Sequence, residues 1–142
     1  MGNLVVEEIS DVDSFRREIW DPLLRQSPDN HIFLTWEWLF SWWQYHGADK
    51  KLRIILIKDN GRIIAIAPLM QSKMRKGVFR FDLLENIGVQ NCDTWGVILA
   101  EKQQECVSAL LNYLERIVKE TGIIIRMWHI PENSSFLNTL RQ

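Results

Sequence analysis

Hydrophobic side chains recur with two different periods along this sequence, and the two periods predict which segments are helices and which are strands. Apolar residues three and four positions apart predict a long amphipathic helix over residues 101–121, closed by Gly122. The same spacing predicts a helix that follows a cap at Ser10 or Asp11 and ends at Pro22. A further short amphipathic helix begins near Phe136.

Short apolar runs of strand length lie between these helices. The Asn60-Gly61 pair separates two of them and predicts a two-residue type I′ hairpin, because both turn residues take a positive φ. Residues 123–130 are apolar on nearly both faces, which is typical of a central strand covered by helices. The predicted strands are residues 4–8, 52–58, 63–70, 78–84, 95–99 and 123–130.

The most distinctive segment is residues 36–43, which hold four of the seven tryptophans in the chain. Thr35 is placed to cap a helix here and Gly47 to end it. Apolar rings fall on two faces of this helix, so we expect it to be sandwiched between other elements. The element order is then β-α-α-β-β-β-β-α-β-α, which predicts a layered α/β domain with helices on both sides of a sheet.

Composition narrows the class of protein. With 142 residues, 46% of them apolar and 25% charged, the chain has the size and make-up of one globular domain, residues 1–142. A net charge of −1 excludes a strong overall field for nucleic acid, so no nucleic-acid partner is expected. No apolar run reaches the length of a membrane span, and no signal peptide precedes the first strand.

The two cysteines, Cys92 and Cys106, stand alone without a CxxC motif or a histidine at metal-ligand spacing. We expect reduced structural thiols, no bound metal and a cytoplasmic location.

Three segments together resemble one family, the CelD/BcsL-type acyltransferases, which are GNAT-like proteins linked to bacterial cellulose and exopolysaccharide synthesis. They are the aromatic segment 31–47, the Ala-Ile-Ala-Pro-Leu run at residues 65–69 and the Ile-Pro-Glu-Asn-Ser turn at residues 130–134. The resemblance runs from about Phe15 to Leu140. It implies a GNAT-like α/β fold, a mixed and mainly antiparallel sheet flanked by helices, with acyl-CoA entering between the two central strands.

The sequence departs from the GNAT pattern where the CoA pyrophosphate is held. Family members carry a Gln/Arg-x-x-Gly-x-Gly/Ala loop there, whose backbone N–H groups meet the phosphates. Residues 99–105 contain no glycine, and Glu101 and Glu105 bring negative charge to the start of the helix. We therefore expect this chain to bind no cofactor itself, although a full family member uses acetyl-CoA or another acyl-CoA.

Family members that resemble this chain have two GNAT-like halves, of which the second is the catalytic one. The chain is therefore interpreted as the amino-terminal, non-catalytic half, which shapes the acceptor site for its partner half. Two alternatives stay open. One is a stand-alone module that dimerises through its aromatic helix, and the other is an autonomous acetyl-CoA-dependent N-acetyltransferase with a divergent CoA site.

Candidate site residues are few, and each has a structural explanation beside the functional one. Trp36 and Trp43 could line an acceptor groove, or fill the core and the seam to a second half. Asp93 could orient an acceptor or act as a general base, or bond the backbone of its own turn. No catalytic residue is assigned from the sequence.

The histidines and the basic residues also have structural explanations. His31, His46 and His129 lie far apart in the sequence and share no ligand spacing. The one basic cluster could meet a polyanion, but a charged hairpin that keeps a sheet edge soluble is the simpler interpretation. Its members are Lys73, Arg75, Lys76 and Arg80.

Overall fold

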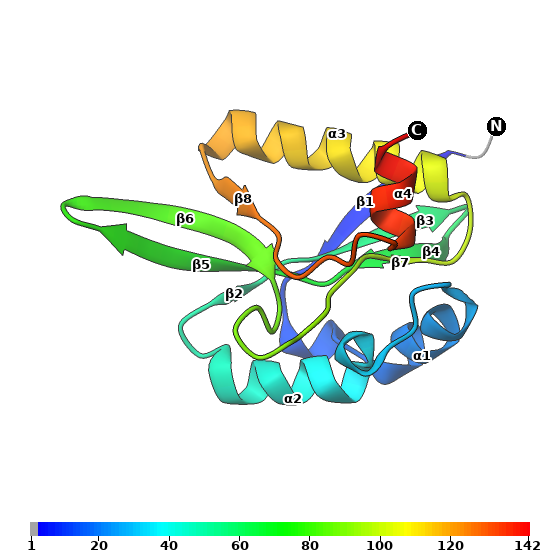
Figure 1. The fold of residues 1–142 in the computed structure, drawn as a ribbon, viewed down its shortest axis with the longest axis horizontal. Helices are drawn as coiled ribbons and strands as arrows, with labels where there is room; N and C mark the ends of the chain where they lie inside the picture. The colour runs from blue at the N-terminus through cyan, green and yellow to red at the C-terminus, as the bar shows by residue number, and fades with distance from the viewer. Residues whose placement is uncertain (1–2) are drawn as a thin grey trace.

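A bent β-meander forms the middle layer of the molecule, with helices on both of its faces (Figure 1). The computed structural model describes residues 3–142. Its strands are β1 (Leu4–Ile9), β2 (Lys51–Leu52), β3 (Ile54–Asp59), β4 (Arg62–Ala67), β5 (Leu69–Lys76), β6 (Phe79–Asn86), β7 (Ile98–Leu99) and β8 (Ile124–Arg126). Its helices are α1 (Arg17–Gln26), α2 (Trp36–His46), α3 (Gln103–Thr121) and α4 (Ser135–Leu140), with short 3₁₀ turns at Val12–Ser14 and Ile32–Leu34.

The strands form two four-stranded sheets that share no strand but follow each other closely along the chain. One has the order β1-β3-β4-β7 and is antiparallel throughout, and the other has the order β2-β5-β6-β8, with β6 and β8 parallel. Only Arg53 separates β2 from β3, and only Pro68 separates β4 from β5. The sheet is thus mixed and mainly antiparallel, as the sequence predicted.

The predicted hairpin at Asn60-Gly61 is confirmed. Asn60 has a φ of 49° and Gly61 a φ of 81°, so both turn residues occupy the left-handed region. The turn joins β3 to β4, whose residues pair from Asp59 and Arg62 inward.

Pro68, between β4 and β5, marks the point at which the chain after β6 leaves the sheet. A proline has no N–H to donate to a neighbouring strand, so the ladder is interrupted there. β6 pairs with β5 up to Asn86 opposite Leu69, the chain then leaves the sheet over residues 87–97, and β7 resumes the pairing on β4. This detour carries a loop out of the sheet and into the region beside α4.

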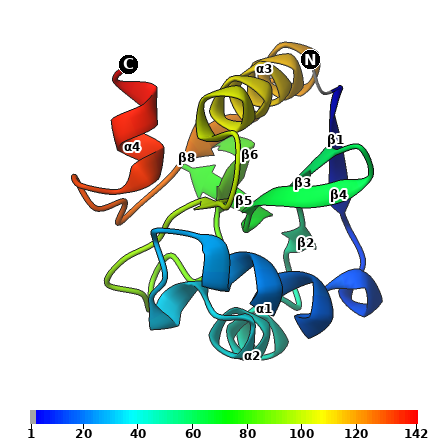
Figure 2. The ribbon, with the colours of Figure 1, turned by 90° about the vertical axis from the view of Figure 1, so that its right-hand side faces the viewer.

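Helices α1 and α2 cover one face of the sheet and α3 covers the other, with α4 packed against α3 beyond β8 (Figure 2). The core lies between these layers and consists mainly of isoleucine and leucine from β3, β4 and β7 with the buried face of α3. Trp20 of α1 is wholly buried in it and donates its indole N–H to the carbonyl of Leu34 at 2.7 Å. Thr35 caps α2 as predicted, since its side chain accepts from the backbone N–H of Trp38.

Several local predictions are wrong. The segment after α3 is not a covered central strand: β8 spans three residues at a sheet edge, and Ile124 is 47% exposed. Pro22 lies inside α1 rather than at its end, because the helix begins at Arg17 and continues to Gln26. Helix α2 is not sandwiched, since it forms part of the outer layer and Tyr45 is 84% exposed. Residues 95–97 precede β7 and are buried without belonging to a strand.

Candidate functional site

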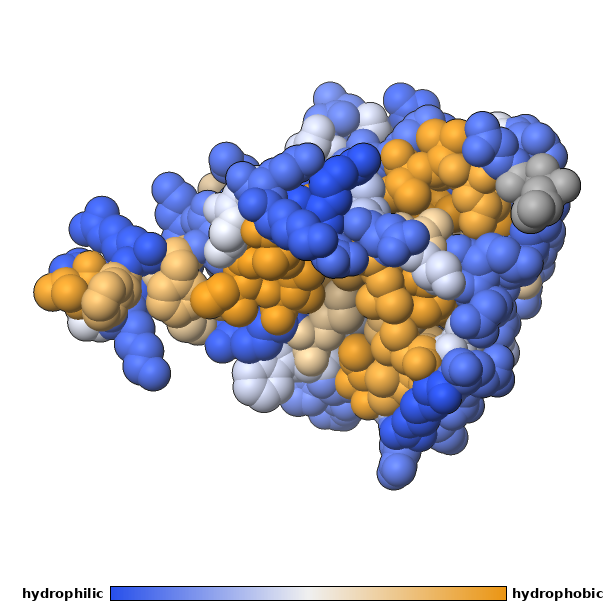
Figure 3. All heavy atoms as spheres, turned by 90° about the horizontal axis from the view of Figure 1, so that it is seen from above, coloured by the Kyte–Doolittle hydropathy of each residue, from blue (hydrophilic) through white to orange (hydrophobic). Residues whose placement is uncertain are grey.

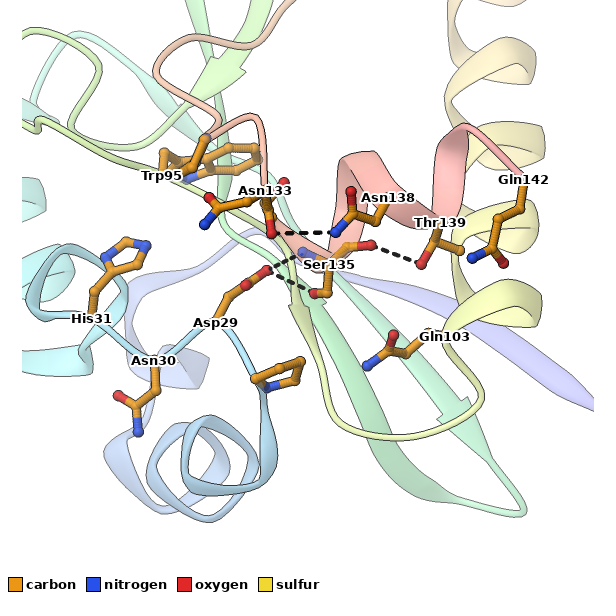
Figure 4. Close-up of a pocket in the computed structure, with 13 residues that line it drawn as sticks. Asp29, Asn30, His31, Trp95, Gln103, Asn133, Ser135, Asn138, Thr139 and Gln142 are labelled. Atoms are coloured by element: carbon orange, nitrogen blue, oxygen red, sulfur yellow. Dashed lines mark hydrogen bonds between the residues drawn. The ribbon is translucent and has the colours of Figure 1, made fainter.

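A polar cleft of about 610 Å³ opens where the detour after β6 meets the start of α3 and the last helix, α4 (Figure 4). Four parts of the chain line it: the loop 28–31 between α1 and α2, Trp95 on the detour, Gln103 at the first turn of α3, and residues 131–142 with α4. Segments that are far apart in the sequence meet here, because the loop after α1 faces the carboxyl-terminal helix. The cleft is therefore a product of the tertiary fold rather than of any local motif.

Asp29 joins the two walls of the cleft. One of its carboxylate oxygens accepts from the backbone N–H of Ser135 at 3.0 Å and from the hydroxyl of the same residue at 2.7 Å. These bonds hold the first turn of α4 against the loop after α1, as the dashed lines in Figure 4 show. Ser134 caps α4 from the other side by accepting from the N–H of Leu137.

His31 points into the cleft from the loop after α1 (Figure 4). Burial lowers the pKa of His31 below its ordinary value of 6.5, and the nearby Asp29 carboxylate opposes that shift only in part. Its Nδ1 lies 3.3 Å from the hydroxyl of Thr94. The imidazole is therefore neutral near pH 7 and can accept a proton or a hydrogen bond.

Trp95 forms the floor of the cleft. The side chain is fully buried, and its backbone N–H donates to the carbonyl of His129 at 2.8 Å, which ties the detour to the segment after β8. Within residues 3–142 its indole N–H has no hydrogen-bond partner. A buried donor without a partner costs about 1–3 kcal/mol, so this N–H is a local cost to the stability of the fold.

The remaining lining is amide and hydroxyl chemistry. Asn30, Gln103, Asn133, Asn138 and Gln142 contribute carboxamides, and no lysine or arginine lines the cleft. Asn138 donates to the backbone carbonyl of Asn133 at 3.3 Å, which orders the turn before α4. Apart from Asp29, then, the cleft offers neutral donors and acceptors.

The residues singled out from the sequence do not meet in this cleft. Trp36 donates its indole N–H to the carbonyl of Phe15 at 3.0 Å and stacks on Phe40 with 4.5 Å between ring centroids. Trp43 lies at the other end of α2, beside Arg53. Asp93 is exposed on the detour and is not part of the cleft lining.

The other two tryptophans of α2 act on the detour. Trp42 donates its indole N–H to the side-chain carbonyl of Asn91 at 2.8 Å. The ring of Trp38 lies against Gly88, where an added Cβ would come within 2.4 Å of it. The aromatic helix thus holds the loop that delivers Trp95 to the cleft.

A second polar cluster sits at the bend between β2 and β3. Arg53 donates to both carboxylate oxygens of Glu8, and the hydroxyl of Tyr113 on α3 donates to one of them at 2.6 Å. Burial alone would raise the pKa of Glu8, but the bonds from Arg53 and Tyr113 outweigh it and lower that pKa. Burial and the Glu8 carboxylate raise the pKa of Tyr113 to about 12. Each of these groups is satisfied by the others, which is typical of a structural cluster.

Comparisons with known proteins bear on the fold. No family model and no curated protein matches this sequence. Among solved structures, a ribosomal-protein-alanine N-acetyltransferase from Brucella melitensis biovar Abortus 2308 superposes with a TM-score of 0.50 at 10% identity, over 92% of this chain and 85% of that one. A transcriptional regulator from Bacillus halodurans C-125 superposes with a TM-score of 0.51 at 11% identity, over 99% of this chain and 91% of that one. The chain has the GNAT fold.

In a GNAT fold the CoA pyrophosphate would lie at the start of the helix that follows the fourth strand of the meander. Here β6 and β7 form that strand, and the helix is α3. Lys102 precedes it with a φ of 46°, a left-handed conformation that glycine adopts more easily. Its ammonium pairs with Asp59 at 2.6 Å, and Arg62 pairs with both carboxylate oxygens of Glu101 at 2.5 and 2.8 Å. Glu101 is thus neutralised instead of facing an anion, which corrects the expectation from the sequence.

Both cations near the start of α3 are therefore already bound to carboxylates, and the cleft beside it holds no other. Free N–H groups of the first helical turn would face a pyrophosphate without any cation to balance its charge. Trp95, in addition, fills the space beside β7. These residues do not fit a CoA pyrophosphate.

The described residues lack two further features. No helix among residues 3–142 combines the length and apolarity that crossing a bilayer requires. Over the same residues no cluster of histidine, cysteine, aspartate or glutamate side chains is arranged to hold a metal ion.

Proposed function

We propose that this GNAT-fold domain binds a neutral, hydroxyl-rich acceptor in the polar cleft and does not itself bind acyl-CoA. The observation that carries the proposal is the cleft lining, which is rich in carboxamides and hydroxyls and lacks any lysine or arginine. In this interpretation the chain is the amino-terminal, non-catalytic half of a CelD/BcsL-type acyltransferase that acts in cellulose or exopolysaccharide synthesis. The resemblance in residues 31–47, 65–69 and 130–134 supports that family.

Carbohydrate chemistry suits such a lining. Each sugar hydroxyl both donates and accepts, so it is matched by side-chain amides, which do the same, and by a carboxylate that only accepts. Asn133 and Asn30 supply the amides at opposite walls, and Asp29 lies between them (Figure 4). None of these groups selects for an anion.

A thermal-shift titration with a cello-oligosaccharide, run beside acetyl-CoA, tests this proposal. Ligand at 100 times its dissociation constant stabilises the fold by about 2.7 kcal/mol, or roughly 5–10 °C for a domain near this size. We expect a saturable shift with the sugar, its loss in Asn133→Ala, and its retention in the matched control Asn112→Ala on the exposed side of α3. A shift with acetyl-CoA and none with the sugar would overturn the proposal.

A second candidate function is that of an autonomous acyltransferase, and one observation favours it. His31 faces the cleft with a pKa lowered by burial, so its imidazole can take a proton from an acceptor amine or hydroxyl near pH 7. Its test is release of free thiol from acetyl-CoA with a panel of amines and sugars, compared between the wild type and His31→Gln. Absence of acetyl-CoA binding up to millimolar concentration would rule out this function and would not count against the first proposal.

Dimerisation through the aromatic helix stays a prediction. Tyr45 is the side chain of α2 that is best placed for such a contact, because the tryptophan and phenylalanine rings of that helix are at least partly buried. Analytical ultracentrifugation over a 100-fold concentration range measures the oligomeric state, and repeating it with Tyr45→Lys shows whether a dimer depends on this contact. A dimer that persists unchanged in the variant would have to use another surface.

A further inference from the structure

The hairpin of β5 and β6 extends beyond the rest of the molecule (Figure 1). β2 pairs with β5 only at Gln71 and Met70, and β8 pairs with β6 only at residues 83–85. Residues 73–82 therefore form a two-stranded projection, in which four residue pairs lead to the turn at Gly77. Four rows at about 3.3 Å each give a projection of roughly 13 Å, without counting the turn.

The two faces of this projection differ, since the apolar side chains share one face with Lys76 alone of the basic residues. Residues directly opposite each other in the ladder share a face, and successive rows alternate between the two faces. Lys76 with Phe79, and Met74 with Phe81, occupy one face. Arg75 opposite Arg80, and Lys73 opposite Asp82, occupy the other.

The end of the projection is unusually apolar for an exposed turn. Val78 is 88% exposed and Phe79 is 71% exposed, the highest values of any apolar side chains of the described residues except Tyr45. Figure 3 shows this hydrophobic tip at the far left of the molecule, flanked by hydrophilic side chains. Side chains of this kind gain stability only when another surface removes them from water.

The basic side chains of the projection also lack partners of opposite charge. Arg75 and Arg80 stand directly opposite each other, an arrangement that destabilises a sheet unless an anion lies near. Among the described residues, none of the four cations of residues 73–81 forms an ion pair with a carboxylate. The projection contains one acidic residue, Asp82, which accepts from the side chain of Gln71 and forms no ion pair within residues 3–142. These charges are free to meet an external anion.

We propose that this hairpin docks on an anionic lipid bilayer, with Val78 and Phe79 entering the interface and the basic side chains binding lipid phosphates. Lys76 shares the ladder row of Phe79, and the other three cations lie one to three rows behind it, about 3–10 Å. Amphipathic elements bury their apolar side about 5–10 Å into the headgroup region. Long lysine and arginine side chains reach the phosphate level from there. The proposal concerns the projection alone and does not depend on what the cleft binds.

Charge distribution over the chain explains why a projection is needed. The net charge of the chain is −1, and the segment 73–81 contributes four positive charges, so the rest has a net charge of −5. An anionic surface repels that body at close range. A projection of roughly 13 Å exceeds the Debye length of about 8 Å at physiological ionic strength, so the repulsion is screened while the tip makes contact.

Vesicle sedimentation tests the proposal on the whole chain. We expect binding to phosphatidylcholine vesicles with 30% phosphatidylserine, weak binding to pure phosphatidylcholine, and a loss of binding as salt rises. Arg75→Gln with Arg80→Gln should lower the partition coefficient roughly 25-fold, since each cation near the surface contributes about fivefold. The control Arg25→Gln with Arg141→Gln removes two exposed charges from α1 and from the residue after α4, and should leave binding unchanged.

A probe at the tip reports insertion separately from attraction. Val78→Cys can be labelled selectively with an environment-sensitive dye, because the two native cysteines are buried. We expect a blue shift of its emission with phosphatidylserine vesicles and none with pure phosphatidylcholine. Equal binding to both vesicle types, or tight binding of a single-stranded oligonucleotide that removes the vesicle signal, would overturn the lipid assignment.

Discussion

Replacing Gly88 by alanine probes how tightly the aromatic helix holds the detour after β6. Gly88 has a φ of 88°, and a Cβ there would lie 2.4 and 2.5 Å from two ring atoms of Trp38. That ring cannot move away freely, because it packs edge-on against Phe33 with 5.2 Å between centroids. The substitution therefore combines backbone strain of about 1–2 kcal/mol with overpacking of about 1–3 kcal/mol.

Gly61→Ala is the matched control. Gly61 has a φ of 81°, so it carries a similar backbone strain, but a Cβ there would meet no atom within 4 Å. Urea unfolding followed by circular dichroism should show a larger loss for Gly88→Ala, and the difference of about 1–3 kcal/mol measures the contact with Trp38.

A double-mutant cycle decides the cause. Trp38→Leu should relieve most of the steric penalty of Gly88→Ala, so the two changes together should cost less than their sum. Equal losses for the Gly88 and Gly61 variants, or strict additivity with Trp38→Leu, would refute the claim that this ring positions the detour.

Three further predictions concern buried polar groups. The pKa of Tyr113 is raised by burial and by Glu8, so the stability it adds is complete below pH 10 and is lost as pH rises through about 12. In thermal melts, the melting temperature of Tyr113→Phe should therefore fall less with pH over that interval than that of the wild type. Burial also raises the pKa of Cys106 to about 12 and that of Cys92 in the same direction, so Ellman's reagent should react with neither until the protein unfolds. Trp20→Phe removes a buried indole donor and leaves its carbonyl partner unsatisfied, which should lower the free energy of unfolding by about 1–3 kcal/mol in urea titrations.

Local physics explains which parts of the fold the sequence predicted. Asn60-Gly61 specifies its own turn, the periodicity of residues 101–121 specifies a helix, and Thr35 specifies where α2 begins, and all three are confirmed within two residues. Each depends on neighbours within one turn of helix or one hairpin. The element order therefore sufficed to predict a layered α/β domain with helices on both sides of a sheet, and the family resemblance supplied the GNAT-like arrangement.

The cleft could not be predicted in the same way, because it is assembled from distant parts of the chain. His31, Asp29 and Ser135 carry no mutual spacing, and only the packing of α4 beside the loop after α1 brings them together. Trp95 was predicted within a strand, whereas the structure places it on the detour between β6 and β7. One local signal was available: a proline inside a predicted strand marks a place where pairing stops.

The Asp29–Ser135 bond also has a kinetic consequence, because its partners are 106 residues apart. The hairpin of β5 and β6 joins adjacent residues and can form early in folding, whereas closing so long a loop comes late. Six residues are too few for α4 to be stable on its own, so its amide protons should be the first in the helices to exchange with solvent. Exchange at α4 thus reads out whether the cleft is closed, and any molecule that bridges its two walls should slow it.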